Sequence, residues 1–406
     1  MIQVEAATAV ALAQPTLYAR PRLRWNLQGG VLDITDRLLG AALPRVRHEL
    51  GAYLSGERFP DVTFELQNAD NLLTPDDVNG SLLQNKDPQD WLLDQIVYDV
   101  EIRRADGTWE AIPIFTGLVS DTLLEPGRIT VTASPVLTYA RQTELPFEFT
   151  LTPSWFIDAA TYFFSSATTI TYPTDYDQSY TSVLELLPSL DWNLYGTIKR
   201  GTTIGDAALL IAKSCVCSMW TTEGGKIAAA SEFPGRCGDF GIWPSYWPDP
   251  IRLDDASDWR LSRPMDLAAR EVVIQYQGVS VAWRSTAHEG NIGRLSRTVT
   301  APYMAFGRQA MLAARLLFEQ YGNYPLTLGF TTGIRGLPIQ LNDRVPVIDP
   351  WTETLRTWRV VSKDVVDPAI IRFEAVLEGH ESTVITNKTF ARWGTTSWNA
   401  AGAEFL

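Results

Sequence analysis

Alternating hydrophobic and polar residues predict β-strands in the first third of the chain. Residues 61–66 (DVTFEL) alternate with a period of two, and the turn-rich segment NADNLLTPDD follows them. The runs VYDVEIRR and WEAIPIFTGLVSDTLL flank the turn ADGT, which predicts a long hairpin with Asp106 and Gly107 at its tip. After a second turn, EPGR, residues 128–134 alternate again and place one apolar face toward a core.

The same succession of strand patterns and turns recurs near the C-terminus in DRVPVID, WRVVSKDVV, the turn DPAI and IRFEAVLEG. The two blocks align without a gap at an offset of 242 residues. The aligned pairs are Ser120 with Ser362, Glu125 with Asp367, Pro126 with Pro368, Ile129 with Ile371, Val131 with Phe373 and Ala133 with Ala375. Any two hairpins with a proline turn share some of this pattern. Because register and turn chemistry agree together, we predict a duplicated β-domain.

The middle of the chain carries the two helical patterns. Apolar residues at helical spacing predict a helix over 204–214, and a hairpin turning at 223–226 follows it. Residues 266–283 predict a pair of strands, and Ala305–Tyr321 has the clearest helical pattern, with Gly322 at the expected C-cap.

Other segments lack a period. The aromatic, Thr- and Ser-rich segment 147–195 suits a loop packed on a neighbour, although its role is open. Residues 238–250 carry interleaved prolines and tryptophans and predict an irregular linker or docking loop. The tail after 385 predicts a flexible or partner-docked end.

Composition narrows the class of protein. The 406 residues suggest about two to four domains, and 45% hydrophobic with 20% charged residues is typical of a globular chain. The formal net charge of −13 disfavours a protein that grips nucleic acid, although a surface that DNA passes without sticking remains open. No run of eighteen apolar residues predicts a membrane span. The N-terminus lacks the basic start of a signal peptide, so we expect it to belong to the mature protein.

Three histidines occur, and none has the spacing of a zinc motif. We expect His48, His288 and His380 to be solvated loop residues rather than ligands or bases. The chain contains no G-x-S-x-G elbow, Walker loop or G-x-G-x-x-G cradle.

The three cysteines form one cluster in the sequence, since Cys215 and Cys217 precede Cys237 by about twenty residues. If 215–221 is a strand, the first two share a face. We favour buried free thiols, because a metal or iron–sulfur site needs a fourth ligand and no fourth cysteine exists. His288 or Asp239 would have to complete such a site.

Acidic residues are frequent beside Pro, Gly or Asn, where a carboxylate stabilises a turn by local hydrogen bonds. A glycosidase pair or a calcium site is the alternative, but no pair has a fixed useful spacing. These residues are Asp76, Asp77, Asp254, Asp255, Asp364 and Asp367. The tryptophan-rich segments suit a protein interface better than sugar binding. We therefore predict no catalytic, cofactor-binding or metal residues and no enzyme.

With catalysis unsupported, the order of elements is the most informative feature. LRWNLQGGVLDITDRLLG, FPDVTFELQNADNLLTP, VYDVEIRRADGTW and IFTGLVSD resemble the start of tailed-bacteriophage tail-tip hub proteins. TIGDAALLIAKSCVCSMWTTEGGKIAAA resembles their helix and hairpin, and REVVIQYQG, LPIQLNDRVPVID and WRVVSKDVV resemble their second barrel. The resemblance covers most of residues 20–380. Two departures are Asn342 before Asp343, where Gly is common, and Asn71, where Gly is frequent.

The resemblance implies a mainly β (α+β) fold with two related β-barrel hub domains and an intervening α+β domain. We expect a first barrel over 1–145, the α+β domain over 146–255, a second barrel with one helix over 256–385 and the tail over 386–406. The implied protein is a structural virion component of a phage tail tip or baseplate, made in the host cytoplasm.

In this family three copies form a hub ring, and two barrels per chain give a pseudo-sixfold ring that stacks on a sixfold tail tube. The implied partners are a second and third copy, the tail tube or distal tail protein, the tape measure protein, fibre or tip proteins, and viral DNA in transit, without membrane insertion. The alternatives are a hexameric distal tail protein with a single barrel, and a tail-associated cell-wall glycan hydrolase using the acids at 76–77 or 364–367.

Overall fold

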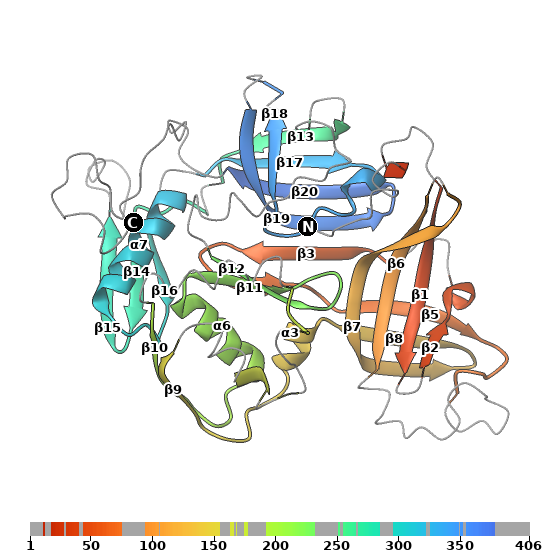
Figure 1. Ribbon diagram of the computed structural model, residues 1–406, viewed down its shortest axis with the longest axis horizontal. Coiled ribbons are helices and arrows are strands. Elements are labelled where there is room, and N and C mark those ends of the chain that lie inside the picture. Colours follow the sequence, from red (N-terminus) through yellow and green to blue (C-terminus); the bar gives the residue numbers. More distant parts are fainter. Residues whose placement is uncertain are drawn as a thin grey trace.

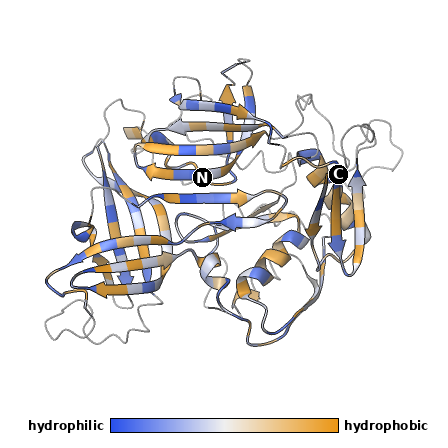
Figure 2. Ribbon diagram, turned by 180° about the vertical axis from the view of Figure 1, so that it is seen from behind, coloured by the Kyte–Doolittle hydropathy of each residue, from blue (hydrophilic) through white to orange (hydrophobic). Residues whose placement is uncertain are grey.

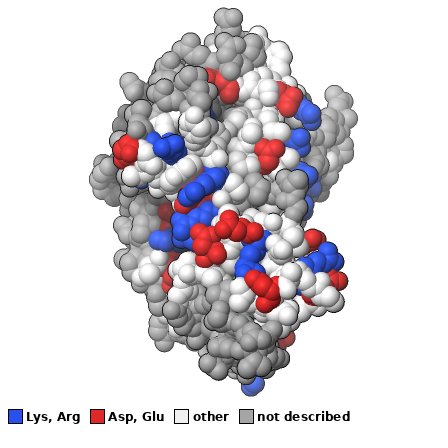
Figure 3. Space-filling view, turned by 90° about the vertical axis from the view of Figure 1, so that its right-hand side faces the viewer, with Lys and Arg blue, Asp and Glu red and all other residues white. Residues whose placement is uncertain are grey.

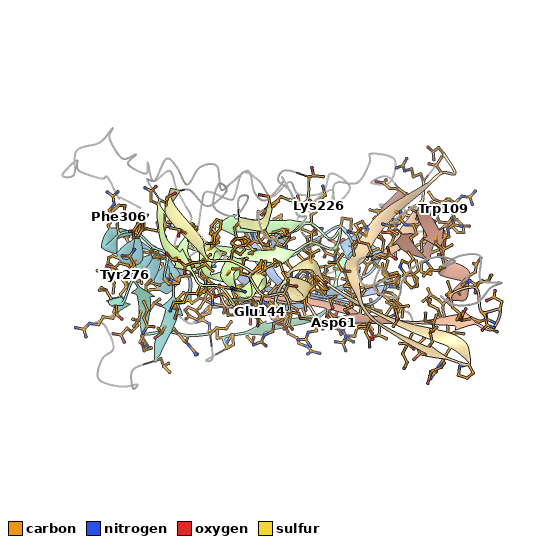
Figure 4. All side chains as sticks on the ribbon, turned by 90° about the horizontal axis from the view of Figure 1, so that it is seen from below. Asp61, Trp109, Glu144, Lys226, Tyr276 and Phe306 are labelled. Carbon is orange, nitrogen blue, oxygen red and sulfur yellow. The ribbon has the colours of Figure 1, made fainter. Side chains whose placement is uncertain are left out.

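Strands dominate the fold, and Figure 1 shows them in curled sheets that lie side by side. The computed structural model describes residues 11–12, 18–27, 30–39, 44–74, 94–104, 106–154, 163–165, 168, 174–177, 192–231, 251, 255–264, 267–284, 295–321, 325–348, 350–351 and 355–377. The predicted linker 238–250 and the tail 386–406 lie outside these residues. Seen from below, the molecule is elongated and flat (Figure 4).

The first sheet has six antiparallel strands. In spatial order they are β2 (Gly30–Asp33), β1 (Ala19–Leu27), β6 (Gln95–Arg103), β7 (Trp109–Glu125), β8 (Gly127–Ser134) and β5 (Val62–Asn68). The predicted hairpin with Asp106 and Gly107 at its tip is confirmed. An isolated bridge between Leu38 and Leu66 joins the segment after β2 to β5, so the sheet curls until its two ends meet.

The second sheet contains the C-terminal strands. Its order is β13 (Ser257–Ser262), β17 (Thr327–Thr332), β20 (Ile370–Leu377), β19 (Leu355–Asp367), β3 (Val46–Gly51) and β4 (Gly56–Arg58), with β18 (Arg344–Ile348) also on β19. A bridge between Ile251 and Val347 links the chain just before β13 to β18. This sheet therefore also curls toward closure.

Four strands of each sheet have the same order, β6-β7-β8-β5 in the first and β18-β19-β20-β17 in the second. Their pairings also share a register. Phe64 faces Val131 as Phe330 faces Phe373, and Val62 faces Ala133 as Leu328 faces Ala375. The inward positions of both hairpins are buried: Ile129, Val131, Ala133, Ile371, Phe373 and Ala375.

The structure corrects the gapless alignment in one place. Both long strands bulge, β7 at Ser120 and β19 at Val361, so these two residues correspond. A second bulge at Val366 adds one residue to β19. Ser120 therefore does not correspond to Ser362, although the turn and β8 keep the offset of 242 residues. Residues 362–365 of β19 are buried on both faces, so this part of the strand has no alternation in which the sequence could reveal the extra residue.

Two sets of elements pack against parts of the fold outside the sequence range of their expected domain. Strands β3 and β4 lie within 1–145 but belong to the second sheet, because β3 pairs with β19 and β4 pairs with β3. Strands β14 (Glu271–Tyr276), β15 (Val279–Arg284) and β16 (Ser296–Thr300) and helix α7 (Gly307–Tyr321) lie within 256–385. They share a hydrophobic core with residues of the middle of the chain.

The middle of the chain supplies the predicted helix and hairpin. Helix α6 (Ile204–Ser214) has the expected bounds and is capped by Thr203, whose side chain accepts from the Asp206 N–H. The hairpin of β11 (Cys217–Thr221) and β12 (Ile227–Ser231) turns at the predicted residues, with Thr222 N–H bonded to the Lys226 carbonyl. Helix α3 (Val136–Ala140) and the strands β9 (Phe149–Ser154) and β10 (Leu194–Ile198) complete this region.

Apolar residues fill the inside of both curled sheets. In Figure 2 hydrophobic and hydrophilic residues alternate along most of their strands, as expected for sheets with one buried face. Trp220, Ala228 and Ala230 of the β11–β12 hairpin belong to the same buried cluster as both sheets. Among the described helices, none is long and apolar enough to cross a membrane.

Candidate functional site

A cluster of buried polar side chains lies where β3, β4, β11 and β19 meet, and we call it the polar junction. It comprises His48, Glu57, Thr221, Glu223 and Lys363, which are at most 3% exposed. These residues come from three distant parts of the sequence, so local patterns cannot bring them together. The junction is the place where the N-terminal region, the central hairpin and the second sheet are joined.

The prediction that His48 is a solvated loop residue is wrong. His48 lies in β3, is 2% exposed, and stacks on Phe59 with ring centroids 3.9 Å apart. Its Nε2 lies 3.0 Å from Oε2 of Glu57. A carboxylate only accepts hydrogen bonds, so Nε2 carries the proton of this contact. Strand β3 buries every second residue against its neighbours, and His48 occupies one of these inward positions.

Glu57 connects β4 to the central hairpin. Its Oε2 accepts from the Thr221 backbone N–H at 2.6 Å, and its Oε1 accepts from the Thr221 hydroxyl at 3.0 Å. Together with His48, the carboxylate therefore has three donors. Charged hydrogen bonds of this kind are stronger than neutral ones, and they satisfy a carboxylate that water does not reach.

Lys363 connects β19 to the same hairpin. Its Nζ lies 3.0 Å from Oε1 of Glu223, and it also donates to the Leu337 carbonyl at 2.6 Å. In the pairing of β19 with β3, Lys363 stands directly opposite His48. Buried ion pairs add little net stability over apolar packing, but removing one partner is strongly destabilising. Any other register of β3 on β19 would separate these buried partners and would therefore be less stable.

A row of charges covers one outer face of the first sheet. Arg20, Arg22 and Arg24 alternate along β1, and they pair with Asp99 and Glu101 of β6. Burial raises the pKa of Asp99, and the nearby Arg24 and Arg22 oppose that rise. Figure 3, which looks onto the side of the molecule that is at the right in Figure 1, shows basic and acidic groups side by side. The face is thus mixed in sign rather than uniformly acidic.

Trp109 extends this charged face at one end of the molecule (Figure 4). The guanidinium of Arg20 lies 4.3 Å from the Trp109 ring centroid, and the tryptophan is 36% exposed. The cation–π contact with Arg20 therefore holds the Trp109 ring in place on the surface.

A groove of about 620 Å³ opens beside the junction, between the second sheet and the middle of the chain. Its lining includes Glu49, Tyr53, Arg58, Arg297, Tyr321 and Arg359. The rings of Tyr53 and Tyr321 pack together with centroids 4.5 Å apart, and burial raises the pKa of Tyr53. Because charges of both signs line the groove, it does not favour a ligand of one charge.

The cysteines behave as buried residues where the structure describes them. Cys215 and Cys217 are fully buried, whereas Cys237 lies outside the described residues. Burial raises the pKa of the Cys215 thiol. The strand begins only at Cys217, and Cys215 is the C-cap of α6, so the expected strand from 215 is corrected. Within the described part of the chain, no three His, Cys, Asp or Glu side chains are grouped to hold a metal ion.

Of the acidic residues, Asp367 fits the turn prediction, because its Oδ1 accepts from the Ala369 N–H at 2.7 Å. Asp364 does not fit it. It lies within β19, is 6% exposed, and binds the Arg45 guanidinium with an Nε–Oδ1 distance of 2.7 Å. Six of the histidine and acidic residues singled out in the sequence lie outside the described residues, namely Asp76, Asp77, Asp239, Asp254, His288 and His380.

The backbone conformation accounts for the two asparagines that depart from the hub-protein pattern. Asn71 has a φ of 57° and Asn342 a φ of 64°, so both adopt the left-handed conformation that favours glycine. Asparagine tolerates this conformation better than most other residues. The departures thus preserve the backbone geometry that a glycine would supply.

The described residues define a mainly β protein with two curled sheets of shared strand order, joined by a buried polar junction. No protein-family model matches the chain, and no curated protein matches it in sequence. Solved structures of phage tail proteins and of type VI secretion components are similar to it.

Three of these structures cover most of the chain. The tail protein from Neisseria meningitidis MC58 is 13% identical, with a TM-score of 0.47 over 88% of this chain and 96% of that one. The 43 kDa tail protein of prophage MuSo2 from Shewanella oneidensis is 11% identical, with a TM-score of 0.46 over 88% and 98%. The Escherichia coli c3393 protein, a component of the type VI secretion system, is 8% identical, with a TM-score of 0.39 over 88% and 77%.

Proposed function

We propose that the chain is a structural virion protein of a phage tail tip or baseplate, and that three copies form a hub ring. The ring adapts a sixfold tail tube to the host-recognition apparatus and lets DNA pass through its centre. In this proposal the protein works through its interfaces and not as an enzyme.

The observation that carries the proposal is the repeated four-strand unit. The pairings β6–β7, β7–β8 and β8–β5 correspond in register to β18–β19, β19–β20 and β20–β17. A bulge at the same place in both units, within three pairings of the same order, favours a duplication over coincidence. We therefore assign the two sheets to two related barrel domains produced by a duplication.

The intervening domain is broader in this proposal than the sequence indicated. It combines α3, α6, β9 to β12, β14 to β16 and α7, because these elements share one hydrophobic cluster. The first barrel then contains β1, β2 and β5 to β8, and the second contains β13 and β17 to β20. Strands β3 and β4 connect the two.

The duplication supports a ring of three chains. Two related domains in one chain present similar surfaces twice, so three chains present them six times around one axis. Head-to-tail contacts close into a ring when their rotation matches that symmetry. The polar junction supports this role, since it holds the second sheet in one orientation relative to the N-terminal region.

The charge of the chain suits a channel for DNA. With a formal net charge of −13, the protein repels phosphates and does not hold a passing duplex by ion pairs. The partners in this proposal are the tail tube or distal tail protein, the tape measure protein and the fibre or tip proteins.

Two other functions were open from the sequence. A distal tail protein with a single barrel is disfavoured by the repeated four-strand unit. A glycan hydrolase using Asp364 is disfavoured because Arg45 already engages both carboxylate oxygens.

Mass photometry of the purified chain tests the proposal. We expect a species of three times the 45.2 kDa chain mass in the micromolar range or in the presence of tail-tube protein. A chain that stays monomeric under both conditions contradicts the hub function.

A further inference from the structure

The C-terminal half of β7 has an open edge in the described residues. Strand β6 pairs with β7 only as far as Leu118, and the Val119 N–H then bonds to the Asp94 carbonyl. Beyond that point, among the residues that the structure describes, β7 pairs with β8 alone. An open strand edge carries unpaired N–H and carbonyl groups and is a template for another strand.

The corresponding edge in the second sheet is occupied. Residues 121–124 of β7 pair with 129–132 of β8, and residues 362–365 of β19 pair with 371–374 of β20. The two segments therefore occupy equivalent positions in the two sheets. On their other side, 362–365 pair with β3. One copy of the repeated unit thus carries an added strand at a place where the described residues of the other copy supply none.

The added strand comes from a specific place in the chain. Strand β3 lies in the connection between the segment that closes the first sheet, at Leu38, and β5. In the second sheet, β17 corresponds to β5, and the connection that precedes it contains β14 to β16 and α7. The counterpart of the β3 arm is therefore this three-stranded sheet, and β15 is one of its edge strands.

We propose that β15 of a second copy of the chain adds to the open edge of β7, as β3 adds to β19 within one chain. This inference rests on the proposed ring and names its contact. The same kind of strand addition would then join neighbouring barrels both within a chain and between chains.

The two segments are complementary in chemistry and placement. On β7, Leu123 and Leu124 are 55% and 44% exposed, and on β15 Val279 is 52% exposed. Asp121 of β7 and Arg284 of β15 are exposed and of opposite charge. Figure 4 shows Trp109, at the start of β7, near one end of the molecule and Tyr276, which precedes β15, near the other, as a head-to-tail contact requires.

The backbone of β7 indicates which residue to change. Glu125 and Arg128 flank a two-residue turn, and hydrogen-bonded and non-hydrogen-bonded pairs alternate from there. The N–H groups of Leu124 and Thr122 therefore point away from β8 and toward the open edge. Proline is tolerated at such an edge position, because the missing N–H takes no part in the pairing with β8.

The test compares Thr122→Pro with Thr122→Ala, which removes the side chain but keeps the N–H. We expect the alanine variant to form trimers like the wild type. We expect the proline variant to associate at least about tenfold more weakly, because the docked strand loses a hydrogen bond to the N–H of residue 122 and clashes with the pyrrolidine ring. Circular dichroism and thermal unfolding check that both variants are folded. Proline trimers as tight as those of the wild type would overturn the contact and leave the proposed hub function intact.

A crosslinking experiment identifies the occupant. A photoreactive benzoylphenylalanine replaces Thr122 in an unlabelled chain, which is mixed with ¹⁵N-labelled chain. We expect mass spectrometry to find crosslinks from position 122 to residues 279–284 of the labelled chain. Crosslinks to another segment would overturn the assignment of β15, and a wild-type chain that never assembles would overturn the ring and this contact together.

Discussion

Replacing Lys363 by methionine tests the polar junction most sharply. The substitution keeps most of the side-chain volume and removes the ammonium group that contacts Glu223 at 3.0 Å and the Leu337 carbonyl at 2.6 Å. Glu223, which is 3% exposed, is then a buried carboxylate without its cation. Breaking a buried pair on one side costs about 3–5 kcal/mol, so we expect the free energy of unfolding to fall by that amount.

The measurement is a guanidinium titration followed by tryptophan fluorescence, since Trp220 and Trp358 are fully buried in the same core as both sheets. Arg315→Met is the matched control. Its salt bridge to Glu319 has a similar length, 2.7 Å, but both side chains are more than a third exposed. We expect the control to lose less than about 0.5 kcal/mol.

A double-mutant cycle separates the pair from its surroundings. Adding Glu223→Gln to Lys363→Met removes the orphaned charge, so we expect the double variant to lose about 1–3 kcal/mol less than the two single losses added together. A loss below about 1 kcal/mol for Lys363→Met would refute the reasoning, because it would mean that Glu223 is not held buried by Lys363.

Three further predictions concern other parts of the fold. Gly225 has a φ of 77°, and a Cβ there would lie 2.7 Å from Thr116 Cγ2, whereas Gly201 has a φ of 82° and open space around it. Gly225→Ala should therefore lower the unfolding midpoint more than Gly201→Ala does. Equal effects of the two substitutions would contradict the contact between the hairpin and the first sheet. Hydrogen bonding to Arg37 lowers the pKa of Asp70 to about 2, so its contribution to stability is present above pH 3.8 and is lost as the pH falls through 2; a carboxyl NMR titration should show this midpoint, and Arg37→Ala should return it toward 3.8. Cys215 and Cys217 should resist a thiol reagent such as iodoacetamide until the chain unfolds, and rapid labelling of either in the native state would contradict their burial.

Local signals allowed much of the fold to be predicted from the sequence. The helix at 204–214 and the hairpin turning at 223–226 depend on spacing and turn residues that lie within a few positions of each other. The alignment of the two β-blocks worked for the same reason. It failed only upstream of Val366, where a bulge inserts a residue next to a stretch that is buried on both faces and therefore lacks a clear alternation.

The polar junction could not be predicted in this way. His48 lies in a strand of six residues whose partner, β19, is more than 300 residues away in the sequence. Nothing near His48 in the sequence shows that Glu57 and Lys363 will surround it, so a solvated histidine was the more general expectation. Asp364 was misjudged for the same reason, because its partner Arg45 comes from the other end of the chain. The one local signal was the alternation over 46–51, which is short but consistent with a strand.

The central claim is that the two related sheets of each chain build one ring. Electron microscopy of the purified protein in negative stain, with class averages viewed down the ring axis, tests it most directly. We predict threefold rings with a central hole and six outer lobes, two from each chain. Rings with six equivalent copies of the chain, or single particles without rings, would contradict the claim.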